Sequence, residues 1–109
     1  MRKGKQWSWH LYWLGKDTSV KYPSLGTFLK EARVARNLSQ WDVAKKIGYS
    51  SPQFISNLER GISSPPLKLL RVLVDLYEIS PRELVQVIAE EQERILKQNL
   101  VKLRKALTS

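Results

Sequence analysis

The chain has 109 residues, of which 42% are hydrophobic and 27% are charged, a balance typical of one small folded domain with an appendage rather than of a disordered chain. It contains no cysteine, which excludes disulfides, thiolate catalysis and cysteine-ligated metals and fits a reducing compartment such as the cytoplasm. The net charge of +9 favours a polyanionic partner, with nucleic acid ahead of an anionic membrane surface.

The basic excess lies towards the two ends of the sequence. Residues 1–36 carry eight basic and two acidic side chains, residues 37–80 five and four, and residues 81–109 six and four. This pattern suits DNA binding, because flanking charges attract phosphates while a nearly neutral middle supplies shape and hydrogen bonds. The longest strongly apolar stretch, Trp7 to Leu14, is too short for a signal sequence or a membrane span, so we expect no membrane segment.

Residues 1–24 form a basic and aromatic N-terminal arm. The arm begins with three basic residues and continues with three tryptophans, which are Arg2, Lys3, Lys5, Trp7, Trp9 and Trp13. Alternation and aromatic enrichment favour an extended segment over a helix. The tryptophans are more typical of side chains that cover a core or a dimer interface than of base-stacking side chains. The basic cluster either enters a minor groove or is a solvated terminus.

From Leu25 onward, helix start and stop signals follow one another at short intervals. A first amphipathic helix is predicted over Leu25 to Arg36, and Asn37 sits where a left-handed residue would end it. Ser39 is a good N-cap for a second helix, with Asp42 in a capping-box arrangement, and Gly48 terminates that helix.

A third and a fourth helix follow. Ser51 and Pro52 are predicted to be the N-cap and the first position of the third helix, and Gly61 is predicted to be its C-cap. Pro65-Pro66 opens the fourth helix, whose buried side is apolar. All four helices are therefore short.

The last helix, which begins at Ser80-Pro81, is predicted to be long because no glycine or proline occurs from Arg82 to Ser109. Its second half carries a heptad-like stripe made of Leu96, Leu100, Leu103 and Leu107. A helix of this length cannot all fold back on so small a core, so self-association is favoured for the stripe. Nearby cationic side chains are more typical of a solvated face than of a second DNA site, namely Lys102, Arg104 and Lys105.

Two short helices joined by a tight turn at Gly48-Tyr49-Ser50 predict a helix-turn-helix. The motif is carried by Leu25-Gly26, Arg33, Leu38-Ser39-Gln40, Val43-Ala44, Ile47-Gly48, Ile55-Ser56, Leu58-Glu59-Arg60-Gly61 and Pro66. On these residues the chain resembles the Xre/Cro family of phage and bacterial repressors. The resemblance implies an all-α, compact lambda-repressor-like helical bundle, here with an aromatic N-terminal arm and a long C-terminal helix. We expect residues 1–24 to be the arm, 25–84 the DNA-binding domain and 85–109 a helical extension for dimerisation.

The same resemblance implies that Gln40 contacts phosphate and that the first half of the third helix reads bases. The DNA-binding side chains expected on this basis are Gln40, Ser50, Ser51, Pro52, Gln53, Ser56, Asn57 and Arg60. Gln53 and Asn57 lie on one helical face and carry amides that can pair with adenine, so a preference for A·T pairs is expected. The alternative is a solvated polar face on a bundle without a ligand. Arg33 and Glu59 resemble the family's buried ion pair and are assigned to structure.

Two features depart from the family pattern, and Trp41 is a further feature of the second helix. The spacing from Gly48 to Gly61 is one residue longer than the commonest spacing, and the extra residue is expected around Tyr49-Ser50-Ser51, where it shifts the contact register. Glu78 stands where glycine is common. Trp41 is expected to pack against the arm rather than to contact a base.

The sequence as a whole predicts a non-enzymatic transcription regulator, most simply a cytoplasmic repressor of bacterial or phage origin, that uses no cofactor and no metal. The only histidine, His10, has no carboxylate or second histidine at ligand spacing, and the chain lacks a Gly-rich phosphate loop. A homodimer would present two recognition helices to a pseudo-palindromic site on double-stranded DNA. The alternative is an antitoxin-like regulator in which the arm or the C-terminal helix binds another protein.

Overall fold

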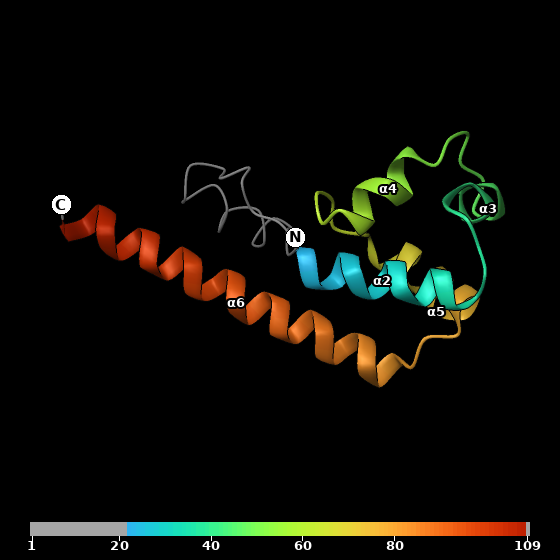
Figure 1. Ribbon diagram of the computed structural model, residues 1–109. Coiled ribbons are helices and arrows are strands. Elements are labelled where there is room, and N and C mark those ends of the chain that lie inside the picture. Colours follow the sequence, from blue (N-terminus) through green and yellow to red (C-terminus); the bar gives the residue numbers. More distant parts are fainter. Residues whose placement is uncertain (1–21, 109) are drawn as a thin grey trace, which may run out of the picture. The chain divides into compact units, whose positions relative to one another are not determined.

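The computed structural model describes residues 22–108, and in this part of the chain it contains five helices and no strand (Figure 1). The helices are α2 (Pro23–Ala35), α3 (Gln40–Lys46), α4 (Gln53–Glu59), α5 (Leu67–Tyr77) and α6 (Pro81–Thr108). The predicted all-α class and the long C-terminal helix are confirmed, and the predictions about the aromatic arm lie outside the described residues. None of the described helices is both long enough and apolar enough to span a membrane.

The chain divides into two compact units, and α6 contributes to both. Of the described residues, 22–91 belong to one unit, which holds α2 to α5 and the first part of α6, and 92–108 belong to the second unit. The helix-turn-helix segment therefore lies entirely within the first unit, whose packing can be described by itself.

Most of the predicted helix ends are confirmed by the backbone. The capping box forms at α3, where Ser39 Oγ accepts from the Asp42 N–H at 2.9 Å and Asp42 Oδ2 accepts from the Ser39 N–H at 2.9 Å. Asn37 has a left-handed φ of 58° just after α2, and Gly61 has a φ of 75° just after α4. Asn37 and Gly61 end α2 and α4 because asparagine and glycine tolerate a positive φ better than other residues do.

The start of α4 was predicted one residue too early. Pro52, not Ser51, is the N-cap, and its φ of −82° with ψ of 3° keeps it outside regular helical geometry. The helix therefore begins at Gln53, although Ser51 Oγ still accepts from the Gln53 N–H at 3.3 Å. The correction matters because it fixes which residues form the first turn of the helix.

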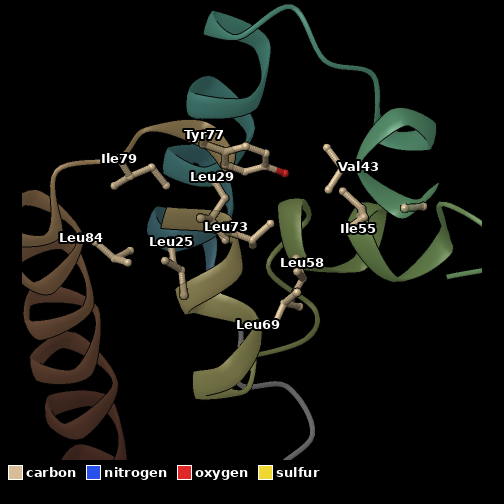
Figure 2. Packing of buried hydrophobic residues seen from close by; sticks show 11 residues of the cluster. Leu25, Leu29, Val43, Ile55, Leu58, Leu69, Leu73, Tyr77, Ile79 and Leu84 are labelled. Atoms are coloured by element: carbon tan, nitrogen blue, oxygen red, sulfur yellow. The ribbon is translucent and has the colours of Figure 1, made fainter. Parts of the chain in front are cut away.

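One hydrophobic core joins α2 to α5 with the start of α6, and Figure 2 shows its side chains meeting between these helices. Its members are Leu25, Leu29, Val43, Ala44, Ile55, Leu58, Leu69, Leu73, Tyr77, Ile79 and Leu84. Val43 of α3 and Ile55 of α4 are both 0% exposed. Full burial of such a side chain contributes about 1.5–3 kcal/mol, so the core holds α3 and α4 in a fixed relation.

Gly26 allows α2 and α4 to approach each other closely. A Cβ atom at this position would lie 2.5 Å from the carbonyl oxygen of Glu59 and 2.8 Å from that of Leu58. Both contacts are with backbone, which cannot move aside as a flexible side chain can. The absence of a side chain at Gly26 thus sets the distance at which the C-terminal end of α4 rests on α2.

Glu91 connects α6 to the first turn of α2. The first turn of α2 has no acidic residue, and Tyr22 provides no side-chain cap. The buried carboxylate of Glu91, only 2% exposed, accepts instead from the Leu25 N–H at 2.7 Å. A carboxylate at a helix N-terminus interacts favourably with the unpaired N–H groups and the helix dipole. This contact joins residues 66 positions apart, so no local sequence signal could have shown it.

Candidate nucleic-acid interface

The connection between α3 and α4 is built on a left-handed glycine. Gly48 has a φ of 84°, and an added Cβ atom would have nothing within 4 Å. Glycine is therefore required here by backbone conformation rather than by space. The Tyr49 N–H donates to the carbonyl oxygen of Ala44 at 2.8 Å, which closes the end of α3 and turns the chain towards α4.

An aromatic pair supports the long turn. The rings of Tyr49 and Phe54 have centroids 5.4 Å apart and are tilted by 40°. Edge-tilted aromatic pairs at this separation are stabilising. The two rings help to line a hollow of about 440 Å³ whose walls are Gly48, Tyr49, Ser50, Ser51, Gln53, Phe54 and Asn57. Six of these residues belong to the connection between α3 and α4 or to the first turn of α4, and four were among the predicted DNA-binding residues. Sequence reasoning overlooked Phe54, whose signal was an aromatic residue directly after Gln53.

The polar face of α4 is organised by hydrogen bonds along the helix. Gln53 Nε2 donates to Asn57 Oδ1 at 3.0 Å, and Arg60 Nη2 donates to the same oxygen at 2.6 Å. Both bonds, of the i, i+4 and i, i+3 type, join side chains on one helical face. We call Gln53, Asn57 and Arg60 the polar trio. The structure thus places three of the predicted DNA-binding residues side by side, two on α4 and one at its C-cap.

A second network includes Glu59 of α4 and is buried. Arg33 Nε donates to Glu59 Oε2 at 2.6 Å, and Arg33 Nη2 donates to Glu59 Oε1 at 3.0 Å. The side chains of Arg33 and Glu59 are only 10% and 4% exposed. Arg33 Nη1 also donates to the Leu38 carbonyl oxygen at 2.7 Å. The hydrogen bonds to Glu59 raise the pKa of Arg33, so the guanidinium group stays charged.

Gln40 joins this buried network instead of standing alone on the surface. Its Nε2 atom donates to Glu59 Oε1 at 2.9 Å, so one carboxylate of α4 is bound by a side chain of α2 and a side chain of α3. We call Arg33, Gln40 and Glu59 the brace. Burial, followed by the charge of Glu59, raises the pKa of Tyr77 to about 12, so that phenol remains neutral beside the brace.

The exposed side of α3 carries an aromatic and cationic pair next to Gln40. Trp41 is 44% exposed, and Lys45 Nζ lies 5.7 Å from its ring centroid. This distance is within the range of a cation–π interaction. The backbone N–H of Ser39 lowers the pKa of Asp42, so the capping carboxylate stays charged. The part of the chain that the structure describes contains no group of three side chains that could hold a metal ion.

Two short helices in a fixed relation, with a buried brace and an exposed polar face on the second helix, define a helix-turn-helix DNA-binding domain. The family model described as helix-turn-helix matches residues 29–84, just over half of the chain. The chain therefore belongs to the helix-turn-helix family of the Xre/Cro type, a DNA-binding family that is typically non-enzymatic. No curated protein and no solved structure matches the chain.

Proposed function

We propose that the protein is a sequence-specific transcription regulator, in the simplest case a repressor, that places α4 in the major groove of its operator. The observation that carries this proposal is the polar trio, which lies on the exposed face of α4 while the opposite face is buried through Ile55 and Leu58. Side-chain amides and guanidinium groups are the donors that read base edges in the major groove.

Of the remaining predicted DNA-binding residues, Ser51 and Ser56 are assigned to the face that reads bases, and Gln40 is assigned to positioning on the phosphate backbone. Ser50 and Ser51 line the hollow beside the start of α4, and Pro52 and Ser56 follow on the same segment. Gln40 is held by Glu59, which would keep its side chain near the phosphates that flank α3. Contacts of this kind fix the register of the protein on DNA and carry no direct sequence information.

We propose further that the second half of α6 mediates homodimer formation. Leu96, Leu100 and Leu107 are 47%, 53% and 75% exposed, whereas Ile95 and Asn99 on another face of the same helix are buried. Apolar residues at alternating spacings of four and three form the seam of a two-stranded coiled coil. A two-fold dimer would present two copies of α4 to half-sites about one helical turn, or 34–36 Å, apart.

The test of this function is the selection of bound fragments from a random DNA library, with the mass of the protein measured in solution beside it. We expect an enriched inverted repeat and a dimeric mass. Binding that depends on salt but enriches no motif would overturn the proposal, because phosphate attraction alone produces such behaviour. A monomeric mass without an inverted repeat would favour the alternative of a cytoplasmic regulator that uses its arm or α6 to bind another protein.

A matched pair of variants tests the proposed dimer seam. Leu100→Glu places a charge on the stripe, while Gln98→Glu places the same charge on an exposed position of α6 outside the stripe. We expect Leu100→Glu to give a monomeric mass and to weaken binding to the inverted repeat, while Gln98→Glu leaves both unchanged. A dimeric Leu100→Glu protein would place the interface elsewhere.

A further inference from the structure

We infer that Asn57 is a positioning residue for the two side chains beside it, and that it meets DNA only as a hydrogen-bond donor. The inference rests on the proposed function, since it concerns how α4 discriminates among base pairs. The observation behind it is that Asn57 Oδ1 accepts at the same time from Gln53 Nε2 at 3.0 Å and from Arg60 Nη2 at 2.6 Å.

The hydrogen-bond capacity of an amide group decides what Asn57 can do. An asparagine side chain has one carbonyl oxygen with two lone pairs and one NH₂ group with two donors. Gln53 and Arg60 together occupy both lone pairs of Asn57 Oδ1. Two-point pairing of an amide with adenine needs that oxygen to accept from adenine N6. Asn57 is therefore left with its two N–H groups.

Gln53 keeps its full capacity to recognise adenine. Only one of the two N–H groups on Nε2 is directed to Asn57, so the other N–H and the Oε1 atom remain for adenine N7 and N6. The contact with Asn57 also restricts the rotation of a long side chain before DNA is bound. Restriction of this kind lowers the entropy lost on binding.

Arg60 likewise keeps enough donors to contact guanine. A guanidinium group has five N–H donors, and one of those on Nη2 is directed to Asn57. The remaining donors can form a two-point contact with guanine O6 and N7. The polar trio is thus expected to read one adenine through Gln53 and one guanine through Arg60. Between them Asn57 can donate to acceptors such as thymine O4 or purine N7, and it cannot accept from cytosine N4.

The experiment compares Gln53→Ala, Asn57→Ala, the double variant and Asn57→Asp on the selected operator and on operators with single base changes. The base pair whose preference disappears in Gln53→Ala is the one that Gln53 reads. We expect Asn57→Ala to reduce the preference at that same base pair by about tenfold, which is the usual size of one two-point contact. The double variant should lose much less than the product of the two single losses.

Asn57→Asp serves as the conservative control. A carboxylate keeps the acceptors for Gln53 and Arg60 but has no N–H donor and adds a negative charge near phosphates. We expect it to bind all sequences more weakly and yet to keep the preference at the Gln53 base pair. Single-variant losses that multiply in the double variant, or an Asn57→Asp protein that loses that preference as Asn57→Ala does, would overturn the inference.

A measurement on the free protein separates this inference from the proposed function. In ¹⁵N-labelled protein, the side-chain NH₂ resonances of Gln53 report the hydrogen bond to Asn57 without any DNA. They should move in Asn57→Ala, which removes the acceptor, and stay close to their wild-type positions in Asn57→Asp, whose carboxylate oxygen still accepts from Gln53 Nε2. Gln53 resonances that do not respond to Asn57→Ala would refute the positioning role even if wild-type protein selects an operator. A wild-type protein that selects no motif would refute the function itself.

Discussion

The two polar networks around α4 use similar groups in different surroundings. The brace joins α2, α3 and α4 through side chains that are 4% to 10% exposed at its ion pair, whereas the polar trio lies on the exposed face of α4 alone. In the brace every donor that binds Glu59 comes from another helix, so its loss disturbs the packing of the domain. In the trio all three residues belong to one helix or its cap, so their loss should change recognition and leave the fold intact.

The largest effect is expected from breaking the brace. Glu59→Ala removes the partner of a buried guanidinium group and should lower the free energy of unfolding by about 3–5 kcal/mol. Urea unfolding followed by circular dichroism measures this loss. The control is Arg33→Met combined with Glu59→Leu, which removes both charges and should recover much of the stability. A loss below about 1 kcal/mol for Glu59→Ala would mean that the brace is not structural.

A pH titration of stability tests the burial of Tyr77, which lies beside the brace in the core. The pKa of Tyr77 is raised to about 12 in the folded protein, compared with about 10 in an unfolded chain. The folded state therefore holds this proton more tightly, so the stabilisation is complete below pH 10 and is lost as the pH rises from about 10 to about 12. We expect a loss of up to about 3 kcal/mol over this range in the wild-type protein. Tyr77→Phe should show a much smaller fall, and equal falls would show that Tyr77 is not responsible.

A smaller loss of stability is expected from substitutions in the turn between α3 and α4. Gly48→Ala forces an alanine into a φ of 84° with open space around it, so strain alone should cost about 1–2 kcal/mol. Gly48→Asn is the matched control, because asparagine adopts left-handed conformations more readily. Thermal unfolding of both variants measures the difference. If both variants unfold at the same temperature, the cost does not depend on how readily the residue adopts a left-handed φ, and the explanation by backbone strain is wrong.

The sequence predicted the parts of this architecture that depend on neighbouring residues. The capping box at Ser39, the left-handed stop at Asn37 and the uninterrupted α6 each follow from residues a few positions apart, and each is present. The start of α4 was predicted one residue too early. The pair Ser51-Pro52 does not reveal from sequence alone whether the proline has a helical ψ.

Contacts between distant segments could not be predicted in this way. The cap that Glu91 provides to α2 depends on how α6 packs, and the close approach at Gly26 depends on the position of α4. For the candidate site, the sequence predicted that Gln53 and Asn57 share one helical face and that Arg60 is a further DNA-binding residue. It could not show that a single oxygen of Asn57 accepts from both neighbours, because that depends on rotamers set by the fold.

The smallest effect on stability is expected from breaking the polar trio, and it sharpens the comparison with the brace. Asn57→Ala removes hydrogen bonds between exposed side chains, so the free energy of unfolding should change by no more than about 0.5 kcal/mol. The same variant should lose sequence discrimination on DNA, whereas Gln40→Ala, which removes a side chain assigned to phosphate contact, should weaken binding to all sequences alike. Paired measurements of urea unfolding and operator affinity test both statements. A loss of stability in Asn57→Ala comparable to that of Glu59→Ala would show that the trio supports the fold. The assignment of the brace to stability and of the polar trio to recognition would then be wrong.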